Sequence, residues 1–259
     1  MYPELFSIGP LTVYSFGVLM ALGFYTGTSV SVYEYNRRGF DGEALWGVLL
    51  WGFVGGLISS RVLSVLNNLD MFMIDPVGTI FAGSGFVWFG GLVGGTAISW
   101  LIIRRRKMDF RVVVDCTAIG IPIGHAIGRM GCHIAGDGDW GTVTDVAWGV
   151  AYTNAIVGWD LPDGINVHPT PIYEALAYTS IGLWLFSLRK KDLPQGTLFA
   201  LYIIMSSLAR FLVEFIRVNP KVALGFTEAQ LVAIALFAGA TVWIARHWAG
   251  PAPEGETAA

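Results

Sequence analysis

The sequence has few charged residues and very few cysteines. Charged side chains make up only 14% of its 259 residues, against about 25% in an ordinary soluble domain. Because 54% of the residues are hydrophobic and the mean hydropathy is +0.59, we infer an integral membrane protein rather than a soluble one. The net charge is only −3 and no long basic run is present, which excludes a nucleic-acid-binding protein as the expected class.

The scarcity of cysteine and histidine also limits the chemistry. The two cysteines, Cys116 and Cys132, lie in one apolar segment, so no disulfide framework is expected. Together with four scattered histidines they show no metal-ligand spacing. We therefore expect neither a metal site nor a cofactor.

Long apolar segments are abundant. Seven of them approach the ~20 residues that a helix needs to cross a bilayer. They run over Leu11–Val32, Leu45–Leu66, Gly78–Ile103, Val112–Gly131, Ile172–Leu188, Thr197–Ile216 and Glu228–Trp248. The first has no basic region before it and runs on too long for a cleaved signal, so we interpret it as a membrane helix. The sequence predicts an all-α polytopic membrane protein.

The connecting charges predict the orientation. Basic residues follow the first, third, fifth and seventh segments, and the loop from Cys132 to His168 carries aspartates without Lys or Arg. Since basic loops stay in the cytoplasm, we expect the N-terminus outside, the C-terminus in the cytoplasm and this loop on the outer face. We predict a single transmembrane domain over 1–250 with a small extracytoplasmic cap inserted at about 132–168, whose "VAWGVAYTN" alternates like a strand. The Pro/Gly/Glu-rich tail 251–259 is expected to be disordered.

Charged residues inside apolar segments are functional candidates, because burying a charge in lipid costs about 2.5–3.5 kcal/mol. In the fourth segment His125, Arg129 and Cys132 follow at i, i+4 and i+7 and share one helix face. Small residues at Gly120, Gly124 and Gly128 would let a neighbouring helix approach closely. The alternative for Arg129 is that it only extends to the lipid headgroups.

The sixth segment carries a second charged stripe. Arg210, Glu214 and Arg217 again lie at i, i+4 and i+7 in "LARFLVEFIR". A structural ion pair between Arg210 and Glu214 is the alternative, and it would leave Arg217 unpaired. Arginine binds phosphate in a planar, bidentate manner. Two arginine sites near the outer face indicate a phospholipid headgroup as ligand.

A third motif, "HPTPIYEA", opens the fifth segment. Its prolines fix the start of the helix. His168 is either a general base or an ordinary surface histidine, and Tyr173 is either a site residue or a member of the interfacial aromatic belt. Glu174 begins an apolar helix, which favours a functional position.

Together these motifs resemble the prolipoprotein diacylglyceryl transferase family. "GRMGCHIAGDGDWG", "HPTPIYEA" and "ARFLVEFIR" follow in the family's order in a seven-segment chain. The resemblance implies an enzyme of the bacterial inner membrane that moves diacylglyceryl from phosphatidylglycerol to the lipobox cysteine thiol of a preprolipoprotein, releasing glycerol phosphate. It implies these two substrates and the bilayer as partners, and we expect a monomer.

The resemblance also implies residue roles. Arg129, Arg210 and Arg217 would bind the headgroup, and Asp137 takes the place of a family glutamate. The implied catalytic set is Arg210, Glu214, His168, Tyr173 and Asp137, with Cys132, His125, Glu174 and Gln230 as accessory residues. By chemistry alone, His168 and His125 are the candidates for the base.

The sequence departs from the family at polar positions. Phe89 and Phe16 stand where the family has a histidine thought to be catalytic and a tyrosine, and Cys132, His133 and Ala135 replace Asn, Phe and Asn. A divergent paralogue is therefore the alternative: it would bind anionic phospholipid and use another acceptor, acylate Cys132 itself, or transfer nothing. A transporter or unrelated scaffold is the third possibility.

Overall fold

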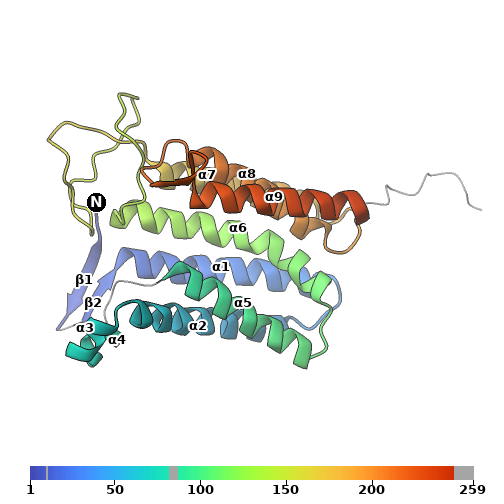
Figure 1. Ribbon diagram of the computed structural model, residues 1–259. Coiled ribbons are helices and arrows are strands. Elements are labelled where there is room, and N and C mark those ends of the chain that lie inside the picture. Colours follow the sequence, from blue (N-terminus) through green and yellow to red (C-terminus); the bar gives the residue numbers. More distant parts are fainter. Residues whose placement is uncertain (10, 82–86, 248–259) are drawn as a thin grey trace, which may run out of the picture. The chain divides into compact units, whose positions relative to one another are not determined.

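The computed structural model describes residues 1–9, 11–81 and 87–247, and these are mostly helical (Figure 1). The chain divides into two compact units, one of residues 1–31 and 114–259 and one of residues 32–113. The predicted disordered tail 251–259 lies outside the described residues. So does the stretch 82–86 of the third predicted segment.

In chain order the elements are β1 Glu4–Ile8, β2 Leu11–Tyr14, α1 Ser15–Arg37, α2 Gly42–Asn67, α3 Leu69–Ile74, α4 Pro76–Phe81, α5 Trp88–Arg105, α6 Phe110–Ala135, α7 Thr170–Leu188, α8 Thr197–Val213, β3 Lys221–Ala223, β4 Phe226–Thr227 and α9 Glu228–His247. Among the described helices, α1, α2, α6 and α9 are long and apolar enough to cross a membrane. The prediction of a helical membrane protein is confirmed at this level.

The helix boundaries correct three predicted segments. The first four residues of the first segment form β2, which pairs antiparallel with β1. The third segment was expected to start at Gly78, but α5 begins only at Trp88. The sixth segment was expected to continue to Ile216, but α8 ends at Val213 and the chain turns there. Hydropathy marks apolar content, and it does not register where the backbone leaves the helix.

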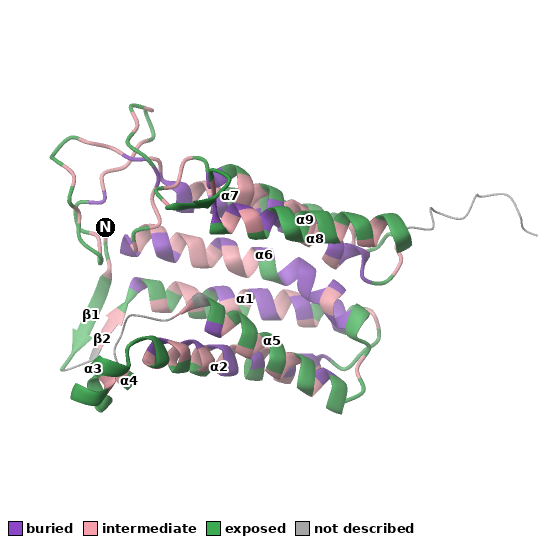
Figure 2. Cartoon of the chain, in the orientation of Figure 1, coloured by how far each residue is buried: buried purple, intermediate pink, exposed green. Residues whose placement is uncertain are grey.

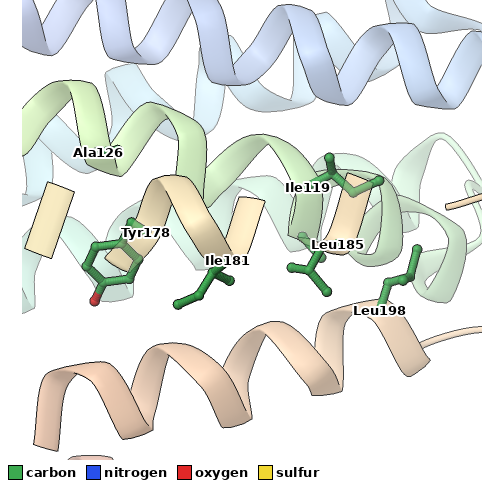
Figure 3. Packing of buried hydrophobic residues seen from close by; sticks show 7 residues of the cluster. Ile119, Ala126, Tyr178, Ile181, Leu185 and Leu198 are labelled. Atoms are coloured by element: carbon green, nitrogen blue, oxygen red, sulfur yellow. The ribbon is translucent and has the colours of Figure 1, made fainter. Parts of the chain in front are cut away.

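The core of the first unit forms where α6, α7 and α8 pack together. It consists of Ala118, Ile119, Ala126, Tyr178, Ile181, Leu185 and Leu198 (Figure 3). At one end of this core the buried Asp115 of α6 accepts hydrogen bonds from the backbone N–H groups of Gly196 (2.7 Å) and Phe199 (3.0 Å). These groups belong to the start of α8, where helical N–H groups lack partners within the helix. Asp115 therefore fixes the start of α8 to α6.

Glycines bring α1 and α6 into close contact within the first unit. A methyl group at Gly23 would lie 2.6 Å from the carbonyl oxygen of Gly124, and one at Gly27 would lie 2.7 Å from that of Gly120. The predicted small-residue contact is thus confirmed for Gly120 and Gly124. A methyl group at Gly128 would meet nothing within 4 Å among the described residues, and its backbone N lies 3.4 Å from the methyl position of Gly23.

The second unit is built on a similar contact between α2 and α5, where Gly52 and Gly56 face Gly95 and Gly91. Ser60 of α2 also donates a hydrogen bond of 2.8 Å to the carbonyl of Val87. Away from these contacts, the helices of both units carry exposed apolar side chains, among them Trp51 of α2 and Leu236 of α9. Figure 2 colours exposed residues green, and they are prominent on α9. Such faces suit a lipid environment.

The predicted cap corresponds to the loop between α6 and α7. Its core is Tyr152, which is fully buried, stacks on Trp140 at 5.0 Å and meets Nδ1 of His133 at 2.9 Å. The strand predicted for "VAWGVAYTN" is wrong: within the described loop only isolated bridges form, Val143 and Val150 each pairing with Val167. Packing of aromatic side chains stabilises this loop. The alternation of apolar and polar residues in its sequence resembles that of a strand, so it did not distinguish the loop from a sheet.

Candidate active site

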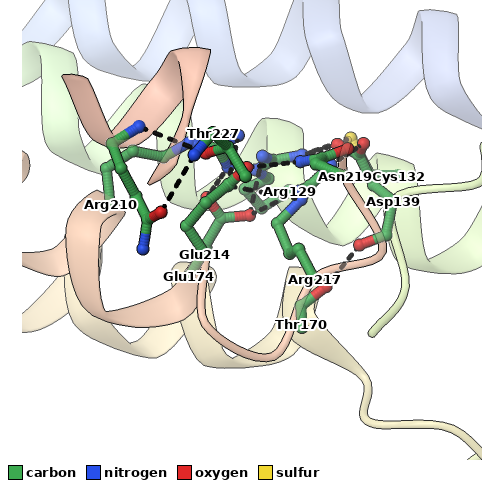
Figure 4. Close-up of polar contacts among 11 residues, drawn as sticks. Arg129, Cys132, Asp139, Thr170, Glu174, Arg210, Glu214, Arg217, Asn219 and Thr227 are labelled. Atoms are coloured by element: carbon green, nitrogen blue, oxygen red, sulfur yellow. Dashed lines mark hydrogen bonds and ion pairs between the residues drawn. The ribbon is translucent and has the colours of Figure 1, made fainter. Parts of the chain in front are cut away.

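Three arginines and three carboxylates meet in the first unit (Figure 4). Arg129 lies near the end of α6 and Arg210 in the last turn of α8. Arg217 follows α8 in a bridge with Gly141, so the backbone of the loop positions it. The three guanidinium groups therefore come from α6, from α8 and from the segment after α8, and they point toward one another.

Glu174 of α7 is the centre of the cluster. Its Oε2 lies 2.6 Å from Nη2 of Arg129 and 3.4 Å from Nη1 of Arg217, and its Oε1 lies 2.9 Å from Nη1 of Arg210. The side chain is only 2% exposed. A buried carboxylate of this kind requires charged partners, and Glu174 has three of them.

Asp139 supplies the second carboxylate, from the loop. Its Oδ2 pairs with Arg129 and its Oδ1 with Arg217, so the carboxylate bridges two guanidinium groups. Thr170 donates a hydrogen bond to the Asp139 carbonyl, and the Asp139 N–H donates to Asp137. Burial alone would raise the pKa of Asp139, but the charges of Arg129 and Arg217 outweigh burial and hold that pKa at about 2. Asp139 is ionised at neutral pH.

Glu214, fully buried just after α8, completes the set. Its Oε2 lies 3.0 Å from Nη2 of Arg210, and its Oε1 accepts a hydrogen bond of 2.6 Å from Asn219. The three arginines and the three carboxylates that form ion pairs with them balance in charge. Within the described part of the chain, Nε of Arg129 and Nε of Arg217 are buried without a hydrogen-bond partner. Buried donors of this kind are rare, and they mark positions where a ligand can accept.

A thiol and a carboxylate adjoin Arg129. The Sγ of Cys132 lies 3.6 Å from Nη1 of Arg129, and the thiol also hydrogen-bonds Asp137. Burial raises the pKa of Asp137 above its ordinary value of 3.8. The hydrogen bond from Cys132 lowers this pKa, and the neighbouring charge of Asp139 raises it further. Ligand atoms of Cys132, Asp137 and Asp139 lie within 4.8 Å of one another. A cation there would meet the Arg129 guanidinium, so we do not assign a metal to this group.

His168 and Tyr173 lie beside an apolar cavity rather than in the arginine cluster. The Tyr173 hydroxyl accepts a hydrogen bond of 2.7 Å from Nε1 of Trp148 and lies 3.1 Å from Nδ1 of His168. The cavity, of about 590 Å³, is lined by Trp148, His168, Pro169, Ile172, Tyr173, Leu176 and Ile216. Glu174 and Arg217 immediately follow Tyr173 and Ile216 in the sequence, so cavity and charge cluster share their backbone.

The remaining candidates have other surroundings. His125 stacks on Tyr178 with ring centroids 3.9 Å apart. Gln230 accepts a hydrogen bond from the Thr227 N–H at 3.1 Å and its own N–H donates to the Thr227 hydroxyl at 3.3 Å, which is the capping box of α9. A methyl group at Gly131 would lie 3.5 Å from the Phe16 ring, close in sequence to Cys132. Phe89 belongs to the second unit.

The sequence indicated most of this cluster but missed two members. The alternative of a structural Arg210–Glu214 ion pair would have left Arg217 unpaired; that ion pair is present, but Arg217 also pairs with Asp139 and Glu174. Asp139 and Asn219 were missed. The local signal for Asp139 was weak: it stands two residues after Asp137 in a glycine-rich turn, ten residues after Arg129.

The fold and this cluster define the class: a multi-pass helical membrane protein with a buried, charge-balanced arginine site. Comparison with known proteins gives the particular family. The sequence profile described as prolipoprotein diacylglyceryl transferase matches residues 3–246, and the chain belongs to this family.

Individual relatives agree. The phosphatidylglycerol–prolipoprotein diacylglyceryl transferase of Dehalococcoides mccartyi is 31% identical over 91% of this chain and 90% of its own length. The protein of the same name from Pseudoalteromonas atlantica is 32% identical over 95% and 90%, and that of Clostridium tetani is 27% identical over 85% and 87%.

Proposed function

We propose that this chain transfers a diacylglyceryl group from phosphatidylglycerol to the cysteine thiol of a preprolipoprotein lipobox. Family membership supports the reaction, and relatives named for it align along most of the chain. The observation that carries the proposal here is the meeting of Arg129, Arg210 and Arg217 in a largely buried site. A phosphodiester is the anionic group that such planar donors bind best.

In the proposed reaction the substrate thiol gives its proton to a base and the thiolate sulfur attacks the terminal glycerol carbon of the diacylglyceryl group. A carbon–sulfur bond forms, the carbon–oxygen bond to phosphate breaks, and glycerol phosphate leaves with the electron pair. The arginines stabilise the charge that builds on the leaving phosphate, and their effect is large because the site is largely buried. Glu174 and Glu214 hold the guanidinium groups in position.

The base is proposed among groups near Arg129. Asp137 is half-buried, has a raised pKa and forms a hydrogen bond with the Cys132 thiol. His125 lies one helical turn from Arg129 on α6, where residues four apart share a face. His168, the other predicted base, meets Tyr173 at the apolar cavity. We propose that His168 and Tyr173 line the cavity through which the lipid or the peptide enters.

We further propose that all seven long helices, α1, α2, α5, α6, α7, α8 and α9, cross the bacterial inner membrane. The alternation of basic and acidic connections supports an outer N-terminus, a cytoplasmic C-terminus and a cap at about 132–168 on the outer face. Residues 1–250 then form one transmembrane domain acting as a monomer on membrane substrates, without nucleic acid. A site beside the outer leaflet gives both amphiphilic substrates lateral access.

Complementation tests the activity. The chain is expressed in a bacterium depleted of its own transferase, and a lipobox peptide is examined by mass spectrometry for a diacylglyceryl thioether. We expect modification by the wild type, loss with Arg129→Ala or Arg210→Ala, and retention with Arg246→Ala, an exposed arginine at the end of α9. In the same series, Asp137→Asn and His125→Gln identify the base, because only the variant lacking it loses turnover while still retaining phosphatidylglycerol.

A well-expressed wild type that modifies no peptide would refute the transferase. If it still retains phosphatidylglycerol through Arg129 and Arg210, the alternative of a lipid-binding paralogue with another acceptor takes its place. If neither arginine variant reduces retention, the headgroup assignment itself is wrong.

A further inference from the structure

The charge balance of the cluster poses a problem for an anionic ligand. Three guanidinium groups already face three carboxylates, Asp139, Glu174 and Glu214. A phosphodiester would add a fourth negative charge to a site of low dielectric, where unpaired charge is costly. Binding therefore becomes favourable when one of the carboxylates gives up its place.

Asp139 is the carboxylate that can leave. Glu174 lies within α7 and Glu214 at the end of α8, with side chains 2% and 0% exposed, whereas Asp139 lies in the loop and its side chain is 30% exposed. Gly136 and Gly138, with φ of 68° and 93°, precede it in left-handed conformations that glycine adopts at little cost. The Asp139 side chain can turn outward without disturbing a helix.

The contacts of Asp139 match those that a phosphate group makes. Its two oxygens engage different arginines, Oδ2 contacting Arg129 and Oδ1 contacting Arg217. The two non-ester oxygens of a phosphodiester have the same bridging capacity. The Nε donors of both arginines, which make no hydrogen bond within the described residues although that of Arg217 lies 3.9 Å from Oε2 of Glu214, would serve them in addition.

We propose that the Asp139 carboxylate occupies the position of the lipid phosphate and is displaced when the lipid binds. The inference rests on the proposed function and locates its ligand within the cluster. Asp139 then acts as an internal competitor. The apparent affinity for the lipid is the intrinsic affinity multiplied by the fraction of molecules in which the Asp139 carboxylate is displaced. Its return after transfer would help to expel the glycerol phosphate product.

Lipid titration tests the displacement. Dioctanoyl phosphatidylglycerol is titrated into the detergent-solubilised full chain, with dioctanoyl phosphatidylcholine as the zwitterionic control. We expect Asp139→Asn to bind phosphatidylglycerol roughly tenfold more tightly than the wild type, because the competing charge is gone. Asp145→Asn, which removes an exposed charge from the same loop, should bind like the wild type.

A second variant keeps every charge. Thr170→Val removes the hydroxyl that holds the Asp139 carbonyl, so we expect it also to bind more tightly, and it decides the question if Asp139→Asn does not fold. If Asp139 merely positions the arginines, its loss weakens binding instead. The displacement alone is overturned if the folded variants bind phosphatidylglycerol equally or more weakly than the wild type, while Arg129→Ala abolishes the binding seen in the wild type. Absence of phosphatidylglycerol binding in the wild type overturns the proposed headgroup site, and displacement with it.

Discussion

Replacing Glu174 by glutamine is the most direct probe of the charge cluster. The change keeps the shape of the side chain and removes one negative charge from the position that contacts Arg129, Arg210 and Arg217. The amide also directs an N–H donor at one guanidinium group that formerly met an acceptor. Because Glu174 is 2% exposed, water cannot compensate.

Breaking a buried ion pair costs about 3–5 kcal/mol. We expect a value near the lower end, about 3 kcal/mol, because Arg210 keeps Glu214 and Arg129 keeps Asp139. For a chain of this size each kcal/mol lowers the unfolding midpoint by roughly 2–4 °C, so Glu174→Gln should unfold roughly 6–12 °C below the wild type.

The assay is thermal unfolding of the purified chain in one detergent at pH 7. The matched control is Glu4→Gln, which removes an exposed carboxylate from β1 and should shift the midpoint by no more than about 2 °C. If Glu174→Gln has the same unfolding midpoint as Glu4→Gln, the cluster does not depend on its central carboxylate, and the account of the site fails.

Three further outcomes can be measured in the same detergent. Gly27→Ala should lower the unfolding midpoint, with a cost of about 1–3 kcal/mol from overpacking against α6, whereas Gly17→Ala in the open part of α1 should not; equal midpoints would contradict the helix contact. Asp115→Ala should cost about 1–3 kcal/mol by leaving two backbone donors of α8 unpaired, and Asp115→Asn, which keeps an acceptor, should cost less. Because the pKa of Asp139 is held at about 2, below its ordinary 3.8, its ion pairs stabilise the fold above pH 3.8 and are lost as the pH falls toward 2. Asp139→Asn should therefore flatten the acid side of a midpoint-versus-pH curve, and an unchanged curve would refute this.

Residue type and spacing predicted much of the site. Arg129, Arg210 and Glu174 attract attention because charges are rare in apolar segments, and this holds without any tertiary information. The helical face shared by Arg129 and Cys132 is also a local property of α6, and the structure brings their side chains to 3.6 Å.

The contacts of the site residues, and the place of Asp139 among them, depend on tertiary structure. Arg217 reaches the cluster because α8 ends at Val213 and the backbone then bridges to Gly141, a pairing between distant parts of the sequence. Asp139 was one of several aspartates in an acidic loop, and its tertiary contacts with Arg129, Arg217 and Thr170 distinguish it from its neighbours. Gln230 was predicted as an accessory site residue from the resemblance, and its two hydrogen bonds with Thr227 at the start of α9 add a structural role that the resemblance did not indicate.

The positions of the acidic residues along the chain have a consequence for biogenesis. Arg210 has Glu214 one turn later on the same segment, and Arg129 has Asp139 shortly after it in the emerging polypeptide. Each cation can therefore be neutralised by a residue synthesised soon afterwards, before its more distant partner in α7 has docked. The translocation machinery would accordingly release these segments into the lipid with their charges already paired.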